Sequence, residues 1–172
     1  PDSASGRRKI STMSSGTGHL QKGHGVSFAD WDCDGDLDLF VVAGGAVPGD
    51  RAYNVLFQNP GHDNHWLKVK FVGTVSNRAS LGVRIRALVQ GSDGKKRSIY
   101  RTVGNNSSFG GNSLVESIGL LDATSVTELE VFWPTSQTTQ TFRDVAADQM
   151  IEVTEGINSF KPLSQPWVGG KS

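Results

Sequence analysis

The chain has 172 residues, in which 17 Lys and Arg balance 17 Asp and Glu, and it contains 21 glycines and one cysteine. A chain of this length can bury a core without disulfides, and the single Cys33 rules out an intrachain disulfide. The balanced charge predicts no nucleic-acid partner, and because no run of 18 apolar residues occurs we expect no membrane span.

The first part of the chain, residues 1–23, is rich in Ser, Gly, Lys and Arg and shows no periodicity. We expect an irregular lead-in there. It has no apolar segment of the kind found in a signal peptide. The abrupt start at Pro1 suits a mature form or a piece of a longer protein.

Short β-strands are predicted along most of the remaining chain. They fall at 25–29, 37–43, 53–58, 66–72, 82–89, 98–103, 114–118, 128–133, 139–142 and 150–154. The alternation is clearest at 66–72, where Leu67, Val69 and Phe71 share one face and Lys68 and Lys70 point the other way. Segment 37–43 is apolar on both faces, which predicts a covered central strand. Many short strands with turns between them predict a mainly β sandwich or barrel. We expect residues 157–172 to be an irregular tail.

An acidic loop lies between the first two predicted strands. Its spacing, D-x-D-x-D-G-x-x-D, is that of a calcium loop, because Ca²⁺ takes six to eight oxygen ligands and Gly35 allows the tight turn. Carboxylates this close repel one another, and a divalent cation removes that cost. We expect four aspartates to bind the ion through their carboxylates: Asp30, Asp32, Asp34 and Asp38. The remaining one, Asp36, is expected to bind it through its backbone carbonyl.

The loop does not belong to an EF-hand, because its twelfth position is Val41 in place of a bidentate Glu and its flanks are predicted strands. Without that Glu we expect an affinity of about 10⁻⁴ M or somewhat tighter, the range of extracellular calcium modules. Such a site stays empty at resting cytosolic calcium. The sequence therefore predicts an extracellular, secreted or periplasmic protein.

Two resemblances to known families follow from these motifs. The acidic loop, with Phe28-Ala29 before it and 37–42 after it, resembles the FG-GAP/VCBS repeat of integrin-type β-propellers. The part that follows resembles the ASPIC/UnbV domain. Its matching motifs include Asn64-His65-Trp66-Leu67, Leu81-Gly82-Val83-Arg84-Ile85, Ser107-Ser108-Phe109-Gly110-Gly111 and Val131-Phe132-Trp133-Pro134.

The resemblance implies an extracellular bacterial protein or a relative of animal cartilage acidic protein. It implies a propeller-blade-like hairpin at 24–60, carrying the calcium loop, and a β-sandwich or barrel at 61–156. One repeat unit is visible where a propeller needs several, so the chain is expected to be either the C-terminal portion of a longer protein, packed on upstream blades, or a reduced stand-alone version. The family's Gly-Leu-Gly motif is Gly119-Leu120-Leu121 here.

These features predict a calcium-stabilised binding or adhesion module that recognises protein or glycan. Arg78 and Phe109, in turn-rich polar loops, are the candidate ligand contacts; the alternative is that these loops only satisfy their own backbone. The sequence shows no G-x-S-x-G elbow and no nucleophile–base pair, so we expect no enzyme. The alternative function is a part of a calcium-dependent enzyme acting on polysaccharide or a natural product.

Overall fold

The computed structural model describes residues 16–18, 22–45, 47, 49, 51–104 and 111–164. These residues form eleven strands in three sheets, which confirms the mainly β prediction. They contain no helix, and so none that is long and apolar enough to cross a bilayer.

The first sheet, which we call the hairpin sheet, has the order β1-β2-β3 and is antiparallel. Its strands are β1 (Lys22–Ala29), β2 (Asp38–Gly44) and β3 (Val55–Phe57). As predicted, β2 is the central strand. The prediction that it is covered holds for the face carrying Val41 and Ala43, which are buried, whereas Phe40 on the other face is 40% exposed.

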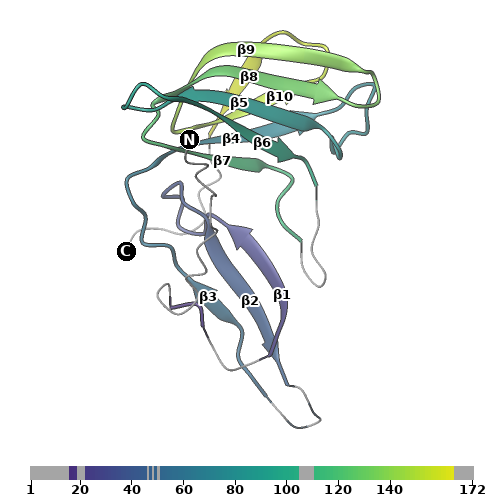
Figure 1. Ribbon diagram of the computed structural model, residues 1–172. Coiled ribbons are helices and arrows are strands. Elements are labelled where there is room, and N and C mark those ends of the chain that lie inside the picture. The colour runs from purple at the N-terminus through teal and green to yellow at the C-terminus, as the bar shows by residue number, and fades with distance from the viewer. Residues whose placement is uncertain are drawn as a thin grey trace, which may run out of the picture.

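The other two sheets have four strands each. The lower sheet in Figure 1 has the order β11 (Phe160–Leu163), β10 (Gln149–Thr154), β4 (His65–Val72), β7 (Glu116–Leu121). The upper sheet has the order β6 (Lys96–Thr102), β5 (Arg84–Gln90), β8 (Ser125–Trp133), β9 (Thr138–Ala146). They stack as a sandwich, and within the described residues they do not close into a barrel. The hairpin sheet lies on the far side of the lower sheet from the upper one (Figure 1).

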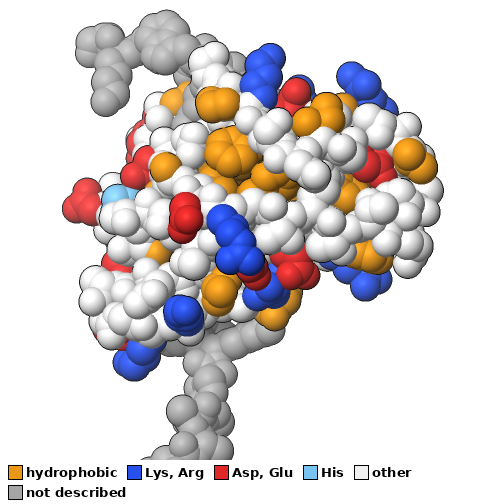
Figure 2. Space-filling view, turned by 90° about the horizontal axis from the view of Figure 1, so that it is seen from above, with side chains coloured by type: hydrophobic (Ala, Val, Ile, Leu, Met, Phe, Trp, Pro, Cys, Tyr) orange, Lys and Arg blue, Asp and Glu red, His pale blue; other side chains and the backbone are white. Residues whose placement is uncertain are grey.

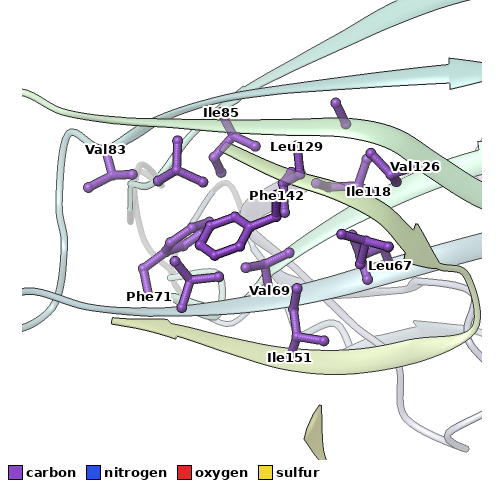
Figure 3. Packing of buried hydrophobic residues seen from close by; sticks show 14 of the residues in the cluster. Leu67, Val69, Phe71, Val83, Ile85, Ile118, Val126, Leu129, Phe142 and Ile151 are labelled. Atoms are coloured by element: carbon purple, nitrogen blue, oxygen red, sulfur yellow. The ribbon is translucent and has the colours of Figure 1, made fainter. Parts of the chain in front are cut away.

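The core lies between the two sandwich sheets (Figure 3). Leu67, Val69 and Phe71 of β4 are 0%, 0% and 4% exposed, which confirms the predicted alternation. They face side chains of the upper sheet, and the ring of Phe71 meets that of Trp133 edge-on with centroids 6.2 Å apart. Each such buried side chain contributes about 1.5–3 kcal/mol to folding, so this core is the main source of the sandwich's stability.

The last two strands, β10 and β11, complete the lower sheet. β10 runs parallel to β4, with Ile151 opposite Val69, and β11 adds an antiparallel edge to β10. The prediction of an irregular tail was wrong for β11. Its Pro162 is tolerated because β11 is an edge strand, where one missing backbone N–H does not interrupt the sheet.

The last residue of β7, which closes the segment Gly119-Leu120-Leu121, has a backbone conformation that favours glycine. Leu121 has φ of 55°, in the left-handed region. A side chain costs roughly 1–2 kcal/mol in this conformation. The turn after β7 therefore begins with a leucine in a conformation that glycine would adopt without this cost.

The upper face of the sandwich carries charges of both signs (Figure 2). Seen from above, acidic and basic side chains are interspersed with apolar ones. Arg86 of β5, for example, donates to Glu128 at 2.7 Å and to Glu130 at 2.8 Å. In that view the face therefore presents no extended patch of a single charge.

A buried carboxylate ties the loop after β4 to the end of β10. Glu155 Oε2 accepts the backbone N–H groups of Thr74, Val75 and Ser76 at 2.7–2.8 Å. Its Oε1 accepts the hydroxyls of Ser76 at 2.8 Å and Ser136 at 2.6 Å. Burial by itself would raise the pKa of the Glu155 carboxyl, but these hydrogen bonds lower it to about 2.

Candidate metal centre

The acidic loop connects β1 to β2 at one end of the hairpin sheet, where Ala29 pairs with Asp38. Two of its residues are left-handed, Cys33 with φ of 61° and Gly35 with φ of 103°. Gly35 is buried, and a Cβ there would lie 1.9 Å from Nε1 of Trp66. The loop therefore needs glycine at this position for two reasons, its backbone conformation and its contact with the sandwich.

Three of the five predicted ligands converge. One carboxylate oxygen from each of Asp30, Asp32 and Asp38 lies within 4.8 Å of the other two. The buried Asp38 is fixed by two backbone donors, the N–H of Trp31 to Oδ2 at 2.7 Å and that of Asn59 to Oδ1 at 2.8 Å. The group offers only oxygen donors held close together, which is the chemistry of a hard-cation site.

Asp32, the exposed member of the group, is also held in place. Gln58 donates from Nε2 to Asp32 Oδ2 at 2.6 Å, and Gln58 follows β3 directly. Each of these hydrogen bonds uses one lone pair and leaves another on the same oxygen. The hydrogen bonds thus orient the carboxylates without using up their capacity to bind a cation.

Asp30 is the member that is incompletely satisfied. Its side chain is 5% exposed, and its Oδ2 accepts both the Nζ of Lys68 and the backbone N–H of Gly35, the latter at 3.1 Å. Its Oδ1 is buried and has no hydrogen-bond partner among the described residues. A buried carboxylate oxygen without a partner is costly, and a bound cation removes that cost. The residues present therefore fit a metal ion.

The side chains of Asp34 and Asp36 are not in the group of three. Asp34 Oδ1 accepts the backbone N–H of Asp36 at 2.9 Å. Burial raises the pKa of the Asp34 carboxyl, the Asp36 N–H lowers it, and the carboxylates of Asp32, Asp30 and Asp36 raise it further. The loop carries an excess of negative charge that favours a cation.

Two side chains of β4 contact the acidic loop: Lys68 pairs with Asp30, and Trp66 packs against Gly35. The sequence did not predict either contact. Lys68 does point away from the sandwich core, as the alternation predicted. It is nevertheless only 7% exposed, because the acidic loop covers that face of β4. Its ammonium also lies 4.6 Å from the ring centroid of Trp66. No local signal marks this contact, since Lys68 and Asp30 are 38 residues apart.

A cavity of about 520 Å³ adjoins the loop, and it is lined by the hairpin sheet, by β4, β7 and β10 of the lower sheet and by the end of β6 of the upper sheet. Its lining includes apolar side chains from the hairpin sheet and from the sandwich, and the carboxyls of Asp30 and Glu116. Burial raises the pKa of the Glu116 carboxyl, although an N–H of Gly104 and the charge of Arg101 oppose the rise. The same cavity is thus lined by Asp30 of the acidic loop and by Lys68, Arg101 and Glu116 of the sandwich.

Of the two candidate ligand contacts, Arg78 is exposed and lines a second cavity of about 540 Å³, together with Lys70 and Glu152. Arg78 belongs to the loop after β4 that Glu155 holds in place. Phe109 lies outside the described residues.

A family model described as ASPIC and UnbV matches residues 73–159, just over half of the chain. The match begins directly after β4 and runs through β10, so it covers most of the sandwich. The acidic loop lies before the matched residues. No curated protein matches the chain in sequence.

Proposed function

The chain belongs to the ASPIC and UnbV family, and on that premise we propose that it is a calcium-stabilised binding module of an extracellular or periplasmic protein. In this proposal Asp30, Asp32 and Asp38 hold the ion through their carboxylates. Asp34 adds a carboxylate and Asp36 a backbone carbonyl. The bound ion neutralises the loop and stiffens the hairpin sheet beside the sandwich.

The observation that carries the proposal is the grouping of three carboxylates, one with a buried oxygen that lacks a partner. Two carboxylates about 4 Å apart repel by about 4 kcal/mol at an effective dielectric constant of 20. Calcium suits this site better than magnesium, because Mg²⁺ requires stricter octahedral geometry and usually retains several waters. Zinc is disfavoured because the group contains neither His nor Cys.

The hairpin sheet is, on this proposal, an FG-GAP/VCBS-type repeat that packs on further blades of a longer protein. Its apolar side chains support this. Phe40 is 40%, Leu56 44% and Tyr53 94% exposed, although they lie in or beside a small sheet. Exposed apolar side chains gathered on one element are typical of interaction surfaces. A calcium site of modest affinity is consistent with an exported protein, because only there would it be filled.

The ligand of the module is proposed to be a protein or a glycan. The loop after β4 offers the surface, because it presents Arg78 beside a cavity and is held by the hydrogen bonds to Glu155. Recognition residues are commonly found on loops that a rigid scaffold holds in place.

Calcium is expected to raise the melting temperature of the chain by about 5–10 °C over the value in EGTA. An ion at about 100 times its dissociation constant adds about 2.7 kcal/mol, and 1 kcal/mol shifts the melting point of a chain this size by about 2–4 °C. Differential scanning calorimetry measures this gain. Asp32→Ala should abolish it, because it removes one of the three carboxylates.

The matched control is Asp93→Ala, which removes a carboxylate from an exposed turn far from the loop in sequence. This variant should retain the full gain from calcium. Identical melting curves of the unmodified chain in calcium and in EGTA would refute the proposed function.

A further inference from the structure

Lys68 is a buried cation that is paired with a member of the acidic group. Its Nζ contacts Asp30 Oδ2, and the two side chains are 8% and 5% exposed. The nearby lysine on the same strand and face, Lys70, pairs instead with Glu152 at 2.9 Å and is 48% exposed. Only the first of these two ion pairs is shielded from water and touches the candidate metal centre.

The two oxygens of Asp30 have different environments. Oδ2 accepts from Lys68 and from the N–H of Gly35, whereas Oδ1 is buried without a partner among the described residues. A metal ion on Oδ1 would therefore share this carboxylate with the ammonium group on Oδ2. The two cations would lie only a few ångströms apart, in a region where screening by water is weak.

We propose that Lys68 is a built-in competitor that weakens calcium binding by the acidic loop. This inference rests on the proposed function, and it concerns the regulation of the same site. The ammonium neutralises part of the charge that attracts the metal, and it repels a divalent ion directly. In the calcium-free chain the same ion pair keeps the loop docked on β4. Lys68 thus sets the calcium concentration at which the loop fills.

The packing around Lys68 favours this role over that of a simple surface ion pair. The ammonium lies 4.6 Å from the centroid of the Trp66 ring, and Trp66 also packs against Gly35 of the loop. The Lys68 side chain is therefore confined between β4 and the loop. An ammonium confined in this way continues to oppose the metal, whereas a solvated one could swing away.

Isothermal titration calorimetry with CaCl₂ tests the inference on the full chain. Lys68→Met, which keeps the length and apolar character of the stem, should bind calcium at least tenfold more tightly than the unmodified chain. Lys68→Arg, which keeps the charge, should stay within about threefold of the unmodified chain. Lys70→Met removes a lysine from the same strand face and should stay within about twofold. If Lys68→Met does not fold without calcium, Lys68→Gln should show the same gain.

Two results would overturn the inference: equal affinities for Lys68→Met and the unmodified chain, or weaker binding by Lys68→Met. The outcome also separates this inference from the proposed function. If the unmodified chain binds no calcium but Lys68→Met does, the competition is supported and the proposed function fails. If the unmodified chain binds calcium and Lys68→Met binds it no better, only the competition fails.

Discussion

Replacing Glu155 with glutamine is expected to lower the free energy of unfolding by about 2–3 kcal/mol at pH 7. The depression of the pKa from 4.5 to about 2 corresponds to roughly 3 kcal/mol, which we discount somewhat because the oxygen that glutamine retains still accepts part of the hydrogen bonds to Glu155. Glutamine keeps the shape of the side chain but replaces the charged carboxylate, whose two oxygens accept three backbone N–H groups and two hydroxyls. Urea denaturation of both proteins measures the difference.

The same carboxylate gives this difference a defined pH dependence. Because the pKa in the folded state lies below the unfolded value of 4.5, the stabilisation is fully present above pH 4.5. It is lost as the pH falls from 4.5 towards 2. The stability gap between the unmodified chain and Glu155→Gln should therefore close over that window.

Glu152→Gln is the control for Glu155→Gln. Glu152 lies three residues earlier on β10 and forms a surface ion pair with Lys70. Its replacement should cost less than about 1 kcal/mol. Equal losses for the two variants, or a Glu155→Gln gap that persists unchanged at pH 2.5, would contradict the role assigned to Glu155.

Gly35→Ala is expected to destabilise the chain by about 3 kcal/mol or more and to weaken calcium binding. The left-handed backbone alone costs an alanine roughly 1–2 kcal/mol. The new Cβ would also overlap the Trp66 ring, with Nε1 at 1.9 Å and Cδ1 at 2.4 Å, so the ring or the loop must move. Chemical denaturation gives the stability, and a calcium titration of the same variant gives the affinity.

Gly94→Ala is the control that separates the cost of the left-handed backbone from the cost of the overlap with Trp66. Gly94 has φ of 76°, and the nearest atom to an added Cβ is 3.9 Å away, so only the backbone cost applies. It should lose about 1 kcal/mol and bind calcium normally. If Gly35→Ala loses no more than Gly94→Ala, the loop is not packed on Trp66 as described.

The sequence predicted those features that short stretches of chain determine. The alternation of Leu67, Val69 and Phe71 placed the core face of β4 correctly, since strand periodicity depends only on neighbouring residues. The spacing of aspartates around Gly35 identified the loop, and the structure brings Asp30, Asp32 and Asp38 together. The ASPIC/UnbV resemblance is confirmed over residues 73–159.

Contacts between distant segments could not be predicted in this way. The donors to Glu155 at Thr74, Val75 and Ser76 lie about 80 residues away, and nothing beside Glu155 marks it as their partner. Lys68 follows the strand pattern of an exposed lysine, yet the acidic loop covers it. The alternation tells which face of a strand a side chain occupies, but not what covers that face.

Diffraction from crystals grown in calcium shows whether the acidic loop holds a divalent cation. An anomalous difference map should show one peak at about 2.3–2.6 Å from carboxylate oxygens of Asp30, Asp32 and Asp38. Ordered water alone at that position, with the three carboxylates turned apart towards solvent, would contradict cation binding by the loop.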